Sequence, residues 1–225
     1  MSSSPDGASR IDDFTLSLTK KAKPRVCFVP TAAGDAMHQV EAFERAFPPR
    51  RAEASVLRLF RRELTDAQLR THLLSQDVVY VGGGNTANML AVWRLHGVDK
   101  LLLKAWRNGT VLTGVSAGTN IWFEACSTDS FSGLAPFRDG LGLLRDAVCP
   151  HFDGEAMRRP TLHRWVAEGA LPATLAIDDF AAAHFIGQRL VEVVAERPGA
   201  AAYRLVRKGG SAVETRLQSR SLRRR

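Results

Sequence analysis

The chain has 225 residues, of which 45% are hydrophobic and 24% are charged, the composition of an ordinary globular protein. No apolar run is long enough to cross a bilayer, and residues 1–7 lack the basic and apolar segments of a secretory signal. The three cysteines show no metal-ligand spacing such as Cys-x-x-Cys, so we expect a cytoplasmic protein with no membrane partner and no metal.

The net charge of +8 is concentrated at the end of the chain. Residues 204–225 contain eight basic residues and one acidic residue, which leaves about +1 for the rest of the chain. A basic run at a terminus is usually a solvated end rather than a binding device. We therefore do not expect nucleic acid as a partner, and keep binding through these arginines as a weaker alternative.

Up to residue 114 the chain alternates short apolar runs with segments of helical periodicity. Residues 1–9 are expected to be disordered, and Thr65 with Gln68 has the spacing of a capping box. Strands are predicted at 25–30, 55–60, 77–81 and 111–114. Helices are predicted at 11–18, over about a dozen residues after Asp35, from Thr65 to about Ser75, through Leu90 and Trp93, and at 101–106. This alternation predicts a parallel sheet covered by helices.

The pattern changes in the second half of the chain. A loop is expected over 127–140, a short strand within 141–149 and a helix near 159–168, and short β-runs follow from residue 173. The Gly187-Gln188 turn predicts antiparallel hairpins. The fold class is therefore α/β, with a mostly parallel sheet sandwiched by helices and antiparallel C-terminal hairpins. We expect three parts: a tail with a short helix (1–24), a single α/β domain (25–206) and a basic tail (207–225).

Residues 114–118 read Gly-Val-Ser-Ala-Gly, the G-x-S-x-G pattern of a nucleophile elbow centred on Ser116. The flanking glycines leave room for the sharp strand-to-helix turn that exposes the hydroxyl, and the helix behind it directs N–H groups at developing negative charge. The pattern alone also fits a small-residue turn that packs a helix on a strand. The predicted strand before it and helix after it favour catalysis.

A serine nucleophile needs a base and a group that orients the base. Among six histidines, His151 stands at the carboxyl end of a predicted strand, where it would face the same crevice as the elbow. A histidine in an ordinary loop is the alternative. Asp178 and Asp179 share a turn, and we expect one to form the turn and the other to face the histidine, whereas Asp153 lies too close to His151 in sequence to be the first choice.

Residues 82–85 read Gly-Gly-Gly-Asn and follow a predicted strand. They could be part of a dinucleotide loop, but the G-x-G-x-x-G pattern would need glycine where Ala87 stands, so we expect no cofactor. The better interpretation is that exposed backbone N–H groups here join the N–H of Ala117 in an oxyanion hole.

Six segments together resemble the peptidase E (aspartyl dipeptidase) family of serine peptidases, to which cyanophycinases are related. They are G-G-G-N-T (82–86), G-V-S-A-G-T-N (114–120), T-D-S (128–130), G-L-G-L-L (140–144), C-P-H-F-D (149–153) and I-D-D-F-A-A-A-H-F (177–185). The resemblance extends from about residue 25 to about residue 206 and implies a flavodoxin- or glutamine-amidotransferase-like sandwich.

The resemblance implies roles for individual residues: Ser116 as nucleophile, His151 as general base and Asp179 as the acid, with Asp178 in reserve. The oxyanion donors would be Ala117 and Gly83 or Gly84. The substrate-binding candidates are Asn85, Arg158 and Arg159, the arginines for an N-terminal aspartate. Two departures from the family pattern, Phe180 after the acid and Ala183 in place of leucine, could tilt the acidic turn.

The sequence thus predicts a metal-independent serine exopeptidase or dipeptidase that acts on small peptides through an acyl-enzyme. The alternative from another class is a non-catalytic or regulatory relative that binds an amino acid or peptide in the same crevice, for which Phe180 is the sequence support. A homodimer is left open. All of this requires Ser116, His151 and one aspartate to meet at one rim of the sheet.

Overall fold

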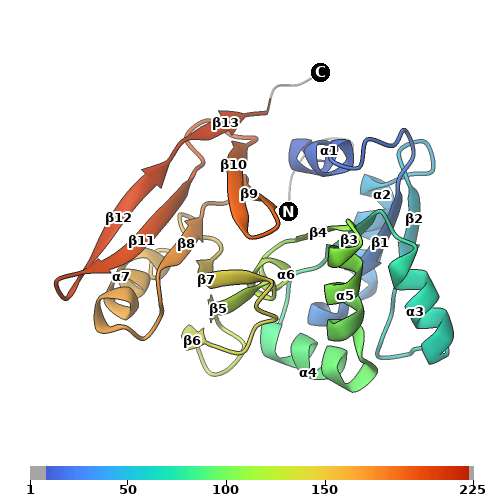
Figure 1. Cartoon of the computed structure of the whole chain (residues 1–225), viewed down its shortest axis with the longest axis horizontal. Helices are drawn as coiled ribbons and strands as arrows, with labels where there is room; N and C mark the ends of the chain where they lie inside the picture. Colours follow the sequence, from blue (N-terminus) through green and yellow to red (C-terminus); the bar gives the residue numbers. More distant parts are fainter. Residues whose placement is uncertain (1–8, 223–225) are drawn as a thin grey trace. The chain divides into compact units, whose positions relative to one another are not determined.

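A computed structural model describes residues 9–222, and its chain contacts separate two compact units, Met1–Gly118 and Thr119–Arg225 (Figure 1). The disorder expected over residues 1–9 lies outside the described residues except at Ser9, which caps the first helix. The single domain expected over 25–206 stays a prediction.

The first unit contains a four-stranded, fully parallel sheet in the order β2-β1-β3-β4. Its strands are β1 (Arg25–Val29), β2 (Glu53–Val56), β3 (Val78–Val81) and β4 (Val111–Gly114). The predicted parallel sheet is confirmed. The last strand leads directly into the Ser116 turn, and β3 leads into the glycine loop, so neighbouring strands bring these two segments together.

Helices flank this sheet, as the β-α alternation predicts (Figure 1). They are α1 (Arg10–Ser17), the 3-10 turn η1 (Thr31–Ala33), α2 (Met37–Ala46), α3 (Asp66–Leu74), α4 (Thr86–His96) and α5 (Val98–Arg107). The capping box is present, because the Thr65 side chain accepts from the Gln68 N–H and the Gln68 side chain accepts from the Thr65 N–H. Val40 and Phe43 of α2 and Phe47 just after it pack against the strands in one buried cluster.

Strand β2 ends at Val56 instead of continuing to residue 60 as predicted. The reason is the Asp35 carboxylate, which accepts the N–H groups of both Leu59 and Phe60 at 2.8 Å and turns the chain away from the ladder. Leu57 and Leu59 are nevertheless buried, so the apolar pattern reflected core packing rather than strand pairing.

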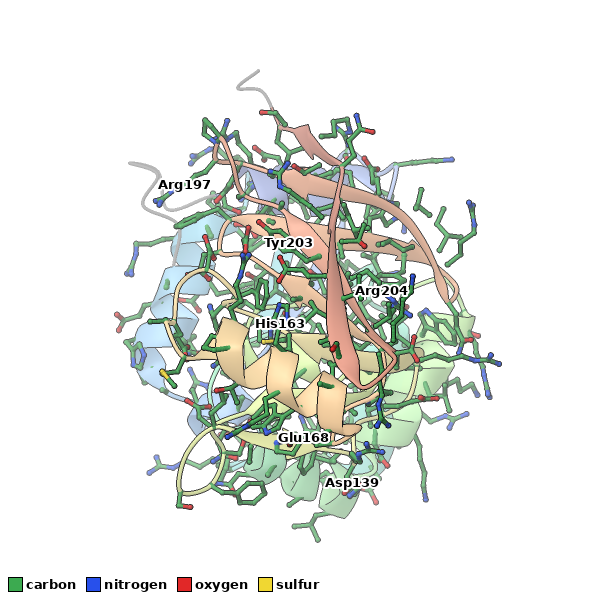
Figure 2. The ribbon with its side chains drawn as sticks, turned by 90° about the vertical axis from the view of Figure 1, so that its left-hand side faces the viewer. Asp139, His163, Glu168, Arg197, Tyr203 and Arg204 are labelled. Carbon is green, nitrogen blue, oxygen red and sulfur yellow. The ribbon has the colours of Figure 1, made fainter. Side chains whose placement is uncertain are left out.

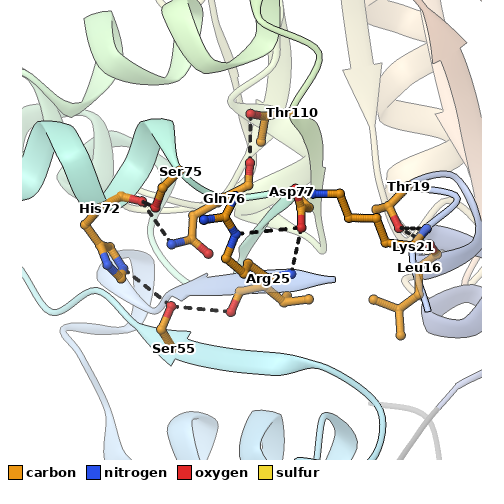
Figure 3. A network of polar contacts seen from close by, with 11 residues as sticks. Leu16, Thr19, Lys21, Arg25, Ser55, His72, Ser75, Gln76, Asp77 and Thr110 are labelled. Carbon is orange, nitrogen blue, oxygen red and sulfur yellow. Dashed lines mark hydrogen bonds and ion pairs between the residues drawn. The ribbon is translucent and has the colours of Figure 1, made fainter. Parts of the chain in front are cut away.

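A polar network joins the chain before β1 to the start of β3 (Figure 3). The Asp77 carboxylate binds the Lys21 ammonium at 2.8 Å and accepts the Arg25 N–H at 2.9 Å. Burial raises the pKa of Asp77, but the hydrogen bonds from Lys21 and Arg25 outweigh it and hold that pKa below its ordinary value. The network fixes where the first strand begins.

The second unit has a six-stranded mixed sheet in the order β12-β11-β8-β7-β5-β6 and a three-stranded sheet in the order β13-β10-β9. Parallel pairing of β5, β7 and β8 continues the α/β pattern, and the flanking strands are antiparallel. Residues 181–186 and 189–195 form the predicted hairpin around Gly187-Gln188. The strands are β5 (Phe123–Thr128), β6 (Ala135–Phe137), β7 (Leu144–Cys149), β8 (Thr174–Ile177), β9 (Ala181–Ile186), β10 (Arg189–Ala195), β11 (Ala202–Lys208), β12 (Ser211–Leu217) and β13 (Ser219–Ser221).

Helix α7 (Arg158–Glu168) packs on this mixed sheet (Figure 2). Leu162, Trp165 and Val166 lie in one buried cluster with Leu205 of β11, and Tyr203 packs against it. The helix ends at Gly169, which adopts φ 79°. This packing stabilises the segment that connects β7 to α7, where His151 lies.

The structure has strands in two segments where we did not predict them. The loop predicted over 127–140 contains β6 and the end of β5, and the basic tail predicted from residue 207 contains β12 and β13. In the second case, Gly209-Gly210, both with positive φ, close a hairpin in which β12 pairs with β11 along its whole length. Residues 223–225 lie outside the described part.

Candidate active site

Ser116 lies in a strained turn between β4 and the short helix α6 (Ala117–Asn120). Its φ is 57°, in the left-handed region, which costs a non-glycine residue about 1–3 kcal/mol. A Cβ at Gly114 would collide with the Gly118 backbone, and a Cβ at Gly118 would collide with the Val81 carbonyl. Both glycines of the motif are therefore required by close backbone contacts, as the elbow pattern predicts.

The glycine loop lies against Ser116 within the same unit. A Cβ at Gly83 would lie 3.2 Å from the Ser116 Cβ and 3.8 Å from its Oγ. The Gly82 N–H donates to Val29 and the Asn85 N–H to Ala32. Within residues 9–222, the N–H groups of Gly83 and Gly84 between them have no hydrogen-bond partner. Two spare donors thus belong to a loop that lies beside the serine at Gly83.

Asn85, expected to bind substrate, is the N-cap of α4. Its Oδ1 accepts the Asn88 N–H at 2.8 Å. This bond satisfies one of the free donors in the first turn of the helix. The Asn85 side chain therefore has a structural role, because its hydrogen bond fixes the end of the glycine loop to the start of α4.

In the second unit, His151 and Asp179 form a close pair. The His151 Nδ1 lies 2.6 Å from Oδ1 of Asp179. The two residues follow the parallel neighbours β7 and β8, whose carboxyl ends lie side by side. An Nδ1–H bond to a carboxylate selects one tautomer and leaves Nε2 free to accept a proton.

The two aspartates of the acidic turn have different surroundings. Asp178 is 5% exposed, and its Oδ2 accepts the Ala201 N–H at 3.0 Å. Burial raises the pKa of its carboxyl. Asp179 is more exposed, and its N–H donates to Oδ1 of Asp153 at 2.7 Å. Asp178 therefore holds the turn, while Asp179 faces the histidine. Asp153, which we did not choose from the sequence as the orienting acid, supports the turn by accepting the Asp179 N–H.

Phe180 follows Asp179 with a φ of 64°, which explains why a small residue suits this position. The Arg197 guanidinium covers the Phe180 ring at 3.3 Å from its centroid. Ring stacking with a cation offsets part of the backbone strain. The hydrogen bond between His151 and Asp179 forms with Phe180 in place.

Replacing Phe180 by glycine should therefore be tolerated better than replacing it by alanine. Glycine relieves the left-handed strain, which alanine keeps, and both changes remove the stacking with Arg197. We expect the glycine variant to exceed the alanine variant by about 1 kcal/mol in free energy of unfolding, measured by chemical denaturation. Equal stabilities would show that the backbone at this position carries no strain.

Arg158 and Arg159 were expected to bind the N-terminal aspartate of a substrate. Both side chains already have contacts within the second unit. Arg158 is 4% exposed and binds Ser127 at 3.2 Å and Glu155 at 3.0 Å. The Arg159 guanidinium lies over two rings, 4.5 Å from that of Phe152 and 4.9 Å from that of Tyr203, which is labelled in Figure 2. Their role in substrate recognition stays a prediction.

A cysteine and a histidine lie side by side in the first unit, but burial makes them unreactive. The Cys27 Sγ lies 3.4 Å from the His72 Nε2, and Ser55 contacts the same nitrogen (Figure 3). Burial raises the pKa of Cys27 to about 12 and lowers that of His72, so both groups are neutral near pH 7. This pair is part of the core.

No helix in the described part of the chain combines the length and apolarity needed to cross a membrane. Among residues 9–222, no group of three or more histidine, cysteine, aspartate and glutamate side chains is arranged to hold a metal ion.

The sequence matches the family model of peptidase family S51 over residues 1–193. It is 42% identical to the uncharacterized peptidase YgaJ of Bacillus subtilis (strain 168) over 202 residues, covering 90% of this chain and 86% of that protein. It is 35% identical to peptidase E of Streptomyces coelicolor over 78 residues, 34% of this chain and 32% of the relative. The crystal structure of a peptidase from an acI-B1 Actinobacterium matches with a TM-score of 0.66 at 17% identity, covering 96% of this chain and 91% of that one.

The fold and these relatives define the protein as an α/β peptidase. More narrowly, the chain belongs to peptidase family S51. The resemblance to peptidase E proteins and the α/β fold class expected from the sequence are confirmed.

Proposed function

We propose that the protein is a serine-type exopeptidase or dipeptidase that hydrolyses small peptides through an acyl-enzyme, with Ser116, His151 and Asp179 as its triad. The observation that carries the proposal is that the chain contains two arrangements, one in each unit. Ser116 occupies a strained elbow beside two spare N–H groups, and His151 is held in one tautomer by Asp179. A cytoplasmic location and a small peptide as the partner belong to the same proposal.

In the proposed mechanism, Ser116 Oγ attacks the scissile carbonyl carbon while His151 Nε2 takes the hydroxyl proton. Asp179 stabilises the imidazolium that forms. The tetrahedral oxyanion is bound by the Ala117 N–H and by the N–H of Gly83 or Gly84, and each such donor contributes on the order of 10²-fold or more to the rate. His151 then gives its proton to the leaving amine, and a water molecule, activated in the same way, releases the acid from Ser116.

The first substrates to test are dipeptides with an N-terminal aspartate. The candidate residues to bind that aspartate are Asn85, Arg158 and Arg159. Arg158 and Arg159 would have to exchange their present partners to bind a carboxylate. The alternative is a non-catalytic relative that binds an amino acid or peptide, and its sequence support was Phe180. The hydrogen bond between His151 and Asp179, which forms beside Phe180, supports the catalytic proposal.

A panel of dipeptides that differ in the first residue tests the proposal. We expect release of free amino acids by the wild-type protein without added metal, and covalent labelling of Ser116 by a fluorophosphonate. The panel also shows whether aspartate is favoured in the first position. A folded protein that hydrolyses no member of the panel and is not labelled would contradict the proposal.

A further inference from the structure

We propose that Gln39 is a positioning residue that orients the oxyanion hole; this inference rests on the proposed function. Gln39 lies in the first turn of α2, remote in sequence from both the glycine loop and the elbow. Its Nε2 donates a hydrogen bond to the Gly83 carbonyl at 3.3 Å. All the groups concerned lie in the first unit.

The orientation of the Gln39 amide is fixed by its neighbours. Only its nitrogen can face the Gly83 carbonyl, because two oxygens would repel each other. Its Oε1 is buried and has no hydrogen-bond partner in the part of the chain that the structure describes. A Cβ at Gly82 would lie 2.8 Å from this oxygen, so the glycine at that position makes room for the side chain.

Holding the Gly83 carbonyl also sets the direction of the next N–H. The carbonyl of Gly83 and the N–H of Gly84 belong to one planar trans peptide, in which they point in opposite directions. The following peptide is held separately, because the Asn85 N–H donates to Ala32 at 2.7 Å. Gln39 therefore fixes the peptide plane that carries the spare N–H of Gly84.

Without this bond, the flanking glycines would let the peptide rotate. Glycine adopts positive and negative φ almost equally, and Gly84 already has a φ of 140°. A rotated peptide would turn its carbonyl, instead of its N–H, toward the side where the oxyanion develops. The loss would appear in the transition state, where the oxyanion exists, and not in ground-state binding.

The test compares Gln39→Ala and Gln39→Glu with His38→Ala, a matched change at an exposed position of the same helix turn. For both Gln39 variants we expect kcat to fall by about 10- to 100-fold, with KM changed less than about threefold. The affinity for a peptide aldehyde, whose adduct carries the oxyanion, should fall by a similar factor. His38→Ala should leave all three quantities unchanged.

Gln39→Glu keeps the shape of the side chain and gives a second readout if the alanine variant fails to fold. Its carboxylate cannot donate to the Gly83 carbonyl, but the protonated carboxyl can. We therefore expect the ratio of its kcat to that of the wild type to rise as the pH falls toward about 4–5. A merely structural role would leave this ratio constant.

The outcomes separate the inference about Gln39 from the proposed function. If Ser116 is labelled and Ser116→Ala is inactive, but the Gln39 variants keep wild-type kcat and aldehyde affinity, the inference about Gln39 is wrong and the proposed function stands. A constant ratio across the pH range likewise overturns it. If Ser116→Ala keeps full activity, the proposed function itself fails.

Discussion

Replacing Ser116 by alanine should lower kcat for a dipeptide substrate by on the order of 10⁵-fold or more while leaving the protein folded. The expected loss is this large because attack and acyl transfer both require the hydroxyl oxygen. Alanine has the same Cβ and, like serine, can adopt the left-handed backbone of the elbow, so the turn keeps its shape. Steady-state kinetics and thermal unfolding of the purified variant measure the two quantities.

Ser75→Ala is the matched control for this variant, because the Ser75 hydroxyl is bonded to the His72 carbonyl at the end of a helix in the same unit. It should keep wild-type kcat. If Ser116→Ala retained more than about a tenth of wild-type kcat, Ser116 would not be the nucleophile.

Replacing Asp179 by asparagine should lower kcat by roughly 10³- to 10⁴-fold. An amide can donate to His151 Nδ1, which then has to be the acceptor, so the proton moves to Nε2 and the imidazole cannot take the serine proton. Fluorophosphonate labelling of Ser116 should slow by a similar factor. The kinetics are measured beside the free energy of unfolding.

Asp178→Asn serves as the control in the same turn. Its side-chain oxygen can still accept the Ala201 N–H, and the variant removes a carboxyl whose pKa burial raises. We expect its kcat to stay within about threefold of the wild type. If instead Asp178→Asn were the inactive variant, the assignment of the two aspartates would be reversed.

The parts of the fold that the sequence predicted correctly depend on local patterns. Alternating apolar runs and helical segments predict the parallel sheet, Thr65 and Gln68 predict a helix start, and the Gly187-Gln188 turn predicts a hairpin. The strands near the C-terminus were missed because the arginines in them led us to interpret this segment as a charged, solvated tail. The Gly209-Gly210 turn was the overlooked signal there.

For the candidate site too, local patterns support some predictions, and other features depend on the folded chain. The G-x-S-x-G pattern predicts Ser116 as the nucleophile, and the position of His151 at the end of a predicted strand predicts it as the base. Which aspartate faces the histidine depends on the backbone angles around Phe180. Two adjacent aspartates in the sequence do not reveal those angles. Nothing in the local sequence distinguishes Gln39 from any other polar residue on a helix, because its contact with Gly83 exists only after α2 packs on the sheet.

The crystal structure of the protein labelled at Ser116 by a fluorophosphonate is the most direct test of the proposed triad. We expect the His151 Nε2 within about 2.6–3.2 Å of Ser116 Oγ, with Asp179 on the opposite nitrogen. The phosphonyl oxygen should accept the N–H of Ala117 and the N–H of Gly83 or Gly84. An imidazole directed away from Ser116, with no side-chain rotation able to bring Nε2 to the serine oxygen, would contradict the mechanism.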